Sequence, residues 1–93
     1  MARVELSAAA VEDLDKLIRS YSLPQDTKER FKRSVKQLAR FPLLGAALEG
    51  RWADFRFVLG PWRWMVVVYV YLETEDRVVI VTIQDGRSSR FAS

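Results

Sequence analysis

The sequence contains no cysteine and no histidine. Without cysteine the chain has no disulfide framework, no thiol nucleophile and no thiolate metal site. Without histidine it lacks the commonest general base and the commonest metal ligand. We therefore expect no bound metal and no cofactor.

The sequence also lacks a long hydrophobic run. The longest such run, Trp64–Leu72, is far too short to cross a bilayer as a helix, which takes about 20 residues. The first ten residues, MARVELSAAA, lack the apolar core of a signal peptide. The chain has 93 residues and is 49% hydrophobic, which is typical of one globular domain. We expect a single domain over residues 1–93, located in the cytoplasm and making no contact with a membrane.

Positive charge is unevenly distributed along the chain, although the net charge is only +3. Lysine occurs only at Lys16, Lys28, Lys32 and Lys36, and every later cation is arginine. The planar guanidinium group suits bidentate contact with phosphate or carboxylate. A general bias of the proteome toward arginine would produce the same pattern, so both interpretations stay open.

Two amphipathic helices are predicted in the first half of the chain. Ser7 can cap the first helix, which ends before Pro24 because a residue preceding proline disfavours helical backbone. The second helix begins at Asp26, which with Glu29 resembles a capping box, and runs to about Phe41. The apolar stripes comprise Val11, Leu14, Leu17, Ile18 and Tyr21 in the first helix, and Phe31, Val35 and Leu38 in the second.

The second helix has a basic outer face. This face includes Lys32 and Lys36, together with Lys28, Arg30, Arg33 and Arg40. Such a face is either simply solvated or a surface for nucleic acid.

Strands are predicted at residues 3–6, 55–59, 63–72 and 77–84. The last three are joined by short turns and should form an antiparallel meander, after a loop that covers residues 43–54. The expected fold is therefore α+β: an N-terminal strand, a two-helix hairpin, then a three-stranded antiparallel meander. Both helices should pack on one face of the sheet.

The strand at residues 63–72 is apolar on both sides. Alternate side chains of a strand point to opposite faces, and a strand with one wet face should alternate apolar with polar residues. One set here is Trp62, Trp64, Val66, Val68, Val70 and Leu72; the other is Arg63, Met65, Val67, Tyr69 and Tyr71. Because two helices cover only one face, we infer that a partner outside this chain covers the other.

Three stretches carry a resemblance over nearly the whole chain: LSAAAVEDLDKLI, LARFPLLGAALEGRWADFRFVLG and VVVYVYLETEDRVVIVTIQDGR. They contain a basic-faced helical hairpin, an FP-x-x-G link, a G-x-W-R strand entry and a last strand that runs into an arginine. In this order they resemble the RelE/ParE superfamily of bacterial toxins. The resemblance implies the toxin of a type II toxin–antitoxin pair.

The same resemblance implies partners. A cognate antitoxin would cover the sheet, and we expect it to contact Met65, Val67, Tyr69 and Tyr71. Operator DNA would be bound only through the antitoxin.

The superfamily has two mechanisms. RelE-type toxins enter the ribosome and cut mRNA with a cluster of basic residues and a tyrosine, whereas ParE-type toxins inhibit DNA gyrase. We expect ribosome-dependent mRNA cleavage, with gyrase inhibition as the alternative and a degenerate, non-toxic binding module as a third possibility.

By the resemblance, Arg56, Arg63 and Arg87 match basic catalytic positions. Val58 stands where another basic residue is expected, and Met65 is an alternative to Arg63 at the strand entry. The tyrosine expected in the C-terminal tail is absent. Further contacts to RNA or another target are expected from Arg51, Arg90, Lys32 and Lys36.

RNA cleavage by the 2′-hydroxyl needs a base, an acid and a group that stabilises the phosphorane charge. Arginine supplies only the last, because its pKa exceeds about 12. Proton transfer is left to Asp54, Asp85, Tyr69 and Tyr71. Each also has a structural interpretation: the tyrosines as packing beneath a partner and Asp85 as a turn former. Arg63, between two tryptophans, is either a phosphate ligand or a cation–π residue.

Overall fold

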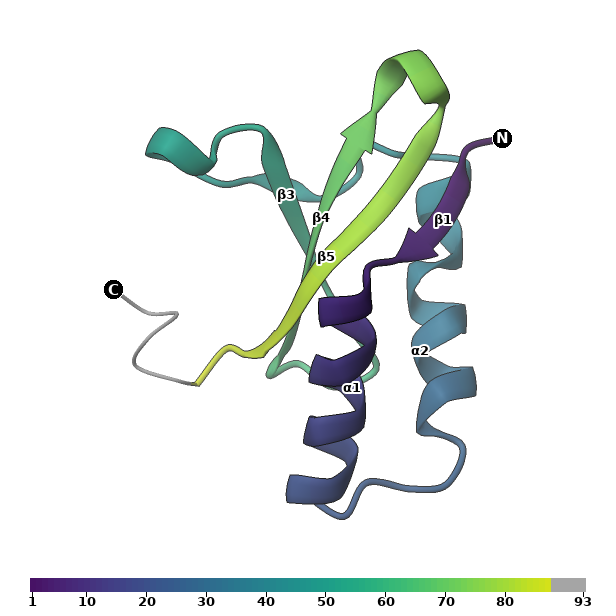
Figure 1. The fold of residues 1–93 in the computed structure, drawn as a ribbon, viewed down its shortest axis with the longest axis vertical. Helices are drawn as coiled ribbons and strands as arrows, with labels where there is room; N and C mark the ends of the chain where they lie inside the picture. Colours follow the sequence, from purple (N-terminus) through teal and green to yellow (C-terminus); the bar gives the residue numbers. More distant parts are fainter. Residues whose placement is uncertain (88–93) are drawn as a thin grey trace.

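Two α-helices pack against one face of a five-stranded sheet in the computed structural model, which describes residues 1–87 (Figure 1). The α+β class and the placement of both helices on one face are as predicted. The elements are β1 (Arg3–Leu6), α1 (Ala8–Ser20), α2 (Thr27–Val35), β2 (Ala46–Ala47), β3 (Phe55–Leu59), β4 (Met65–Leu72) and β5 (Arg77–Asp85), with short 3-10 turns at Lys36–Ala39, Gly50–Trp52 and Glu73–Glu75.

The sheet is larger than the predicted meander. Strands β3, β4 and β5 form the antiparallel meander, and the strand order of the whole sheet is β1-β5-β4-β3-β2. The N-terminal strand β1 adds to β5 in parallel, and β2 lies within the segment predicted as loop and adds to β3. Local patterns predict which residues are extended but not which distant strand they pair with, so both additions come from the tertiary structure.

The two helices begin differently. Ser7 caps α1 as predicted, because its Oγ accepts a hydrogen bond of 3.1 Å from the Ala10 amide. The predicted capping box of α2 is wrong: Asp26 makes no side-chain cap, and its carboxylate instead pairs with Arg30 one turn later, at 3.0 Å. After α2 the chain tightens into the 3-10 turn Lys36–Ala39, so the helical segment ends close to the expected residue.

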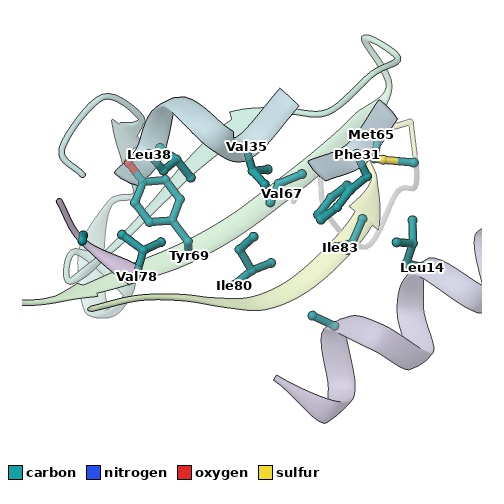
Figure 2. Packing of buried hydrophobic residues seen from close by; sticks show 12 residues of the cluster. Leu14, Phe31, Val35, Leu38, Met65, Val67, Tyr69, Val78, Ile80 and Ile83 are labelled. Carbon is teal, nitrogen blue, oxygen red and sulfur yellow. The ribbon is translucent and has the colours of Figure 1, made fainter. Parts of the chain in front are cut away.

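The core lies between the helices and the sheet (Figure 2). On β4 the core-facing side chains are Met65, Val67 and Tyr69, each with no exposed surface. The expected antitoxin contacts on this strand therefore lie beneath the protein's own helices, and Tyr71 also packs against this core. The side chains of β4 that face away from the helices are the other set, Val66, Val68 and Val70. The remaining core members include Leu14, Phe31, Val35, Leu38, Val78, Ile80 and Ile83.

Within residues 1–87, the opposite side of the sheet carries no helix (Figure 1). We call it the open face, defined by Phe55, Phe57, Leu59, Val66, Val68 and Val70, which pair across β3 and β4. Val66 and Val68 are only 5% exposed yet lie outside the core cluster, whereas Leu59 is 46% exposed. Thr82 and Gln84 lie opposite these two valines on β5, which makes this face less apolar than β4 alone suggests.

Candidate functional site

Arginine and tryptophan side chains stack at the end of the sheet where β4 begins and β5 ends. Trp62 and Trp64 stack with ring centroids 6.1 Å apart and an angle of 19° between their planes. The guanidinium carbon of Arg30, from α2, lies 5.9 Å from the Trp62 ring, and that of Arg87 lies 5.0 Å from the Trp64 ring. We call these four side chains the Arg–Trp stack. Cation–π attraction joins one helix to the end of the last strand here.

A tight connection between β3 and β4 places the tryptophans. The Gly60 amide donates to the Met65 carbonyl at 2.8 Å, and the Met65 amide donates to the Trp62 carbonyl at 3.0 Å. The Gly86 amide then donates to the Trp64 carbonyl at 2.6 Å, which brings the end of β5 beside the ring of Trp64. The backbone of this turn thus aligns Arg87 with the stack.

Asp85 joins the stack to helix α1. Its carboxylate accepts hydrogen bonds from the Arg87 backbone amide at 2.9 Å and from Arg87 Nε and Nη2, each at 3.1 Å. The Tyr21 hydroxyl, at the end of α1, donates to Asp85 Oδ2 at 2.5 Å. We call Tyr21, Asp85 and Arg87 the Asp85 clamp.

Charge pairing sets the protonation of this clamp. Hydrogen bonds from Arg87 and then Tyr21 hold the pKa of Asp85 well below its usual range, so the carboxylate is ionised at neutral pH. The hydrogen bond to Asp85 raises the pKa of Tyr21 and of Arg87. Neither Tyr21 nor Arg30 was among the site residues predicted from sequence, although Tyr21 closes the apolar stripe of α1.

Arg56 lies away from the stack. It sits on β3 opposite Tyr69, four positions along β4 from Met65, which corresponds to about 13 Å. Its Nη1 donates to the carbonyl oxygens of Gly45, at 2.8 Å, and Leu43, at 3.3 Å. The structure therefore does not bring Arg56 together with Arg87; Arg56 braces the loop before β2.

Arg63 shares the stack's end of the sheet but not its contacts. It is exposed in the turn before Met65, and Met65 pairs with Asp85. The cation–π role considered for Arg63 belongs instead to Arg30 and Arg87 among the described residues.

The other predicted contact residues are scattered. Arg51 lies over the ring of Trp52 at 5.3 Å, in the 3-10 turn before β3, and Arg90 lies outside the described residues. Val58 packs against the core. Lys32 and Lys36 line a groove of about 410 Å³ between α2 and β1. Its lining is Val4, Leu6, Lys32, Arg33, Val35, Lys36 and Ala39, with no member of the Arg–Trp stack.

The predicted proton-transfer residues also lie apart. Tyr69 is buried; burial raises its pKa, and its hydroxyl accepts from the Gly45 amide. Tyr71 donates to Asp76 at 2.7 Å, and Asp54 is exposed before β3. Two of these residues lie beside a predicted catalytic arginine: Asp85 binds Arg87, and Tyr69 lies opposite Arg56.

Within residues 1–87 no three acidic side chains gather into a group able to hold a metal ion. In the same part of the chain neither helix has the length and apolar character needed to cross a membrane.

Known proteins resemble this chain in sequence pattern and in fold. A family model described as the ParE toxin of the type II toxin–antitoxin system parDE matches residues 4–90. No curated protein sequence matches significantly.

Solved structures show the same fold at low identity. A metal-bound toxin from Helicobacter pylori has a TM-score of 0.71 and 22% identity, with 94% of this chain and 97% of that chain covered. The isolated E. coli RelE toxin has a TM-score of 0.70 and 16% identity, with 99% and 93% covered. The chromosomal ParDE system from P. aeruginosa has a TM-score of 0.68 and 17% identity, with 91% and 96% covered.

Proposed function

Because this chain belongs to the ParE toxin family of type II toxin–antitoxin systems, we propose that it stops growth by binding DNA gyrase rather than by cutting mRNA. The sequence favoured mRNA cleavage, with gyrase as the alternative. One observation reverses that order: Arg56, which a basic cleavage cluster would need, is committed to the loop carbonyls about 13 Å from the end where Arg63 and Arg87 lie.

The chemistry around Arg87 supports binding over cleavage. A general base for the 2′-hydroxyl must accept a proton, but the Asp85 carboxylate already accepts four hydrogen bonds and its pKa is strongly lowered. Tyr21, the other hydroxyl or carboxyl group that the structure places beside Arg87, has a raised pKa and already donates its hydrogen bond to Asp85. Neither group is poised to exchange protons near neutral pH.

The composition of the same end supports a protein target. Tyrosine, tryptophan and arginine are the residues that most often dominate binding energy at protein interfaces. Tyr21 is 45% exposed, the Arg87 side chain is 61% exposed, and Arg63 is exposed in the turn before β4. We propose that this end of the molecule contacts gyrase.

The test compares two reactions of the purified chain. We expect inhibition of DNA supercoiling by gyrase and intact mRNA on translating ribosomes. Arg63→Ala should weaken gyrase inhibition by about tenfold, since a lost contact to a charged group costs about 1.5–3 kcal/mol. Arg3→Ala is the matched control, because the Arg3 side chain is 74% exposed and lies beside Arg77, at the opposite end of β5 from Asp85, and it should inhibit like the wild type. Cut mRNA with normal supercoiling would reject gyrase as the target.

We also propose that a cognate antitoxin binds this chain and covers the open face. The support is the row of apolar side chains on β3 and β4 that neither α1 nor α2 covers, with Leu59 46% exposed at one end. Expressed alone, the chain should self-associate. Co-expressed with the product of an adjacent acidic reading frame, where its gene has one, it should elute as a single complex. This proposal would be rejected if the chain alone is monomeric and does not bind that product.

A further inference from the structure

The Asp85 carboxylate binds one side of the Arg87 guanidinium group. Arg87 Nε and Nη2 both donate to it at 3.1 Å, and the Arg87 backbone amide donates to the same carboxylate at 2.9 Å. Of the three guanidinium nitrogens, Nη1 is the one that makes no hydrogen bond to Asp85. The pair therefore directs one end of the guanidinium away from Asp85.

Aromatic rings restrict Arg87 further. The guanidinium carbon lies 5.0 Å from the Trp64 ring and 5.6 Å from the Tyr21 ring, and these two rings meet edge to face at 5.1 Å. An exposed arginine ordinarily samples many rotamers and loses that freedom when it binds. Here a side chain that is 61% exposed already has one carboxylate and two rings around it.

We propose that Asp85 is a positioning residue that presents the Nη1 end of Arg87 to a carboxylate of the protein target. This inference rests on the proposed function. Asp85 and Arg87 together carry no net charge, so the pair contributes direction more than attraction. A preorganised guanidinium loses less conformational freedom on binding, which favours affinity. Tyr21 supports the arrangement because its hydroxyl donates to Asp85 Oδ2 and its ring borders Arg87.

A double-mutant cycle tests this role. The readout is the protein concentration that halves gyrase supercoiling, for the wild type, Asp85→Asn, Arg87→Ala and the double variant. Each single substitution should raise that concentration by about tenfold, in line with one charge-assisted contact. The double variant should be no worse than Arg87→Ala, because Asp85 acts only through Arg87. Losses that multiply in the double variant would overturn the proposal.

Arg87→Lys separates direction from charge. Lysine keeps the positive charge but cannot make the side-on pair through two nitrogens. We expect it to inhibit as poorly as Arg87→Ala. Full activity of Arg87→Lys would show that charge alone suffices, and would also overturn the proposal.

Two controls separate the role of Asp85 from a loss of folding and from an error in the identity of the target. Thermal unfolding of every variant identifies those that fail to fold; if Asp85→Asn is one, Tyr21→Phe replaces it, since it removes a single hydrogen bond from the carboxylate. Tyr21→Phe should weaken inhibition in the wild type and have no effect in the Arg87→Ala background. If the wild type leaves gyrase untouched, the proposed function fails by itself. The double-mutant cycle is then measured as growth inhibition at matched expression levels. A double variant no worse than Arg87→Ala supports the role of Asp85, and losses that multiply in the double variant overturn it.

Discussion

The Tyr69 hydroxyl, at the centre of the sheet, accepts a hydrogen bond of 2.8 Å from the backbone amide of Gly45. Gly45 lies in the loop before β2, and a Cβ added there would meet the Phe57 carbonyl oxygen at 2.5 Å and the Tyr69 ring at 2.9 Å. Only glycine lets the loop approach this closely. Arg56 binds the carbonyl of the same glycine, so one residue of the loop is held from both of its peptide groups.

Tyr69→Phe should lower the free energy of unfolding by about 1–3 kcal/mol, because it leaves the Gly45 amide buried without a partner. Urea denaturation followed by fluorescence measures this. Tyr71→Phe is the matched control: its hydroxyl bonds to Asp76 at the surface, so the change should be small. Equal effects of the two substitutions would contradict the assignment.

Arg56→Ala should lower the free energy of unfolding by about 1 kcal/mol, as expected for a partly exposed side chain that loses its hydrogen bonds to loop carbonyls. At temperatures where the variant is folded, its inhibition of the target should equal that of the wild type. Dose–response curves checked against thermal unfolding distinguish the two effects. A folded Arg56→Ala protein without activity would show that Arg56 belongs to the functional site.

Acid should weaken the Asp85 clamp. The pKa of Asp85 is lowered in the folded chain from an ordinary value near 3.8, so the unfolded chain takes up the proton first as pH falls. The stabilisation is complete above about pH 5 and is lost progressively below the unfolded pKa. Thermal melting between pH 7 and pH 2 should therefore fall more steeply for the wild type than for Asp85→Asn. Parallel curves would show that the clamp contributes nothing to stability.

Leu59→Asp should weaken antitoxin binding by at least about tenfold, because it places a charge on the open face where the partner would bury apolar surface. The protein's own stability should hardly change, since Leu59 is 46% exposed. Isothermal titration with the purified antitoxin measures the affinity. Leu43→Asp serves as control: Leu43 is 59% exposed but lies in the loop away from the open face. Unchanged affinity of Leu59→Asp would exclude this end of the open face.

Local patterns determined much of the fold. Ser7, Pro24 and the apolar stripes predicted both helices, because caps, proline geometry and the helical period act within a few residues. Short turns predicted the antiparallel meander of β3, β4 and β5 for the same reason. The quoted stretches indicated the toxin superfamily, to which the chain's family belongs.

The tertiary structure decided which face of β4 the helices cover. Both sets of side chains on β4 are apolar, so alternation could not distinguish the core set of Met65, Val67 and Tyr69 from the open set of Val66 and Val68. The choice depends on the full arrangement of β1, β5 and the helices around this strand. It placed Met65, Val67 and Tyr69, which the sequence suggested as antitoxin contacts, in the core.

The partners of the arginines were likewise decided by packing. A guanidinium group binds any acceptor within reach, and its chain position does not say which acceptor folding brings there. Arg56 meets loop carbonyls 11 and 13 residues before it, and Arg87 meets Trp64 and the end of α1. Sequence alone determined that these cations follow particular strands; only the tertiary structure separated Arg56, which braces a loop, from Arg87, which stands exposed beside Asp85.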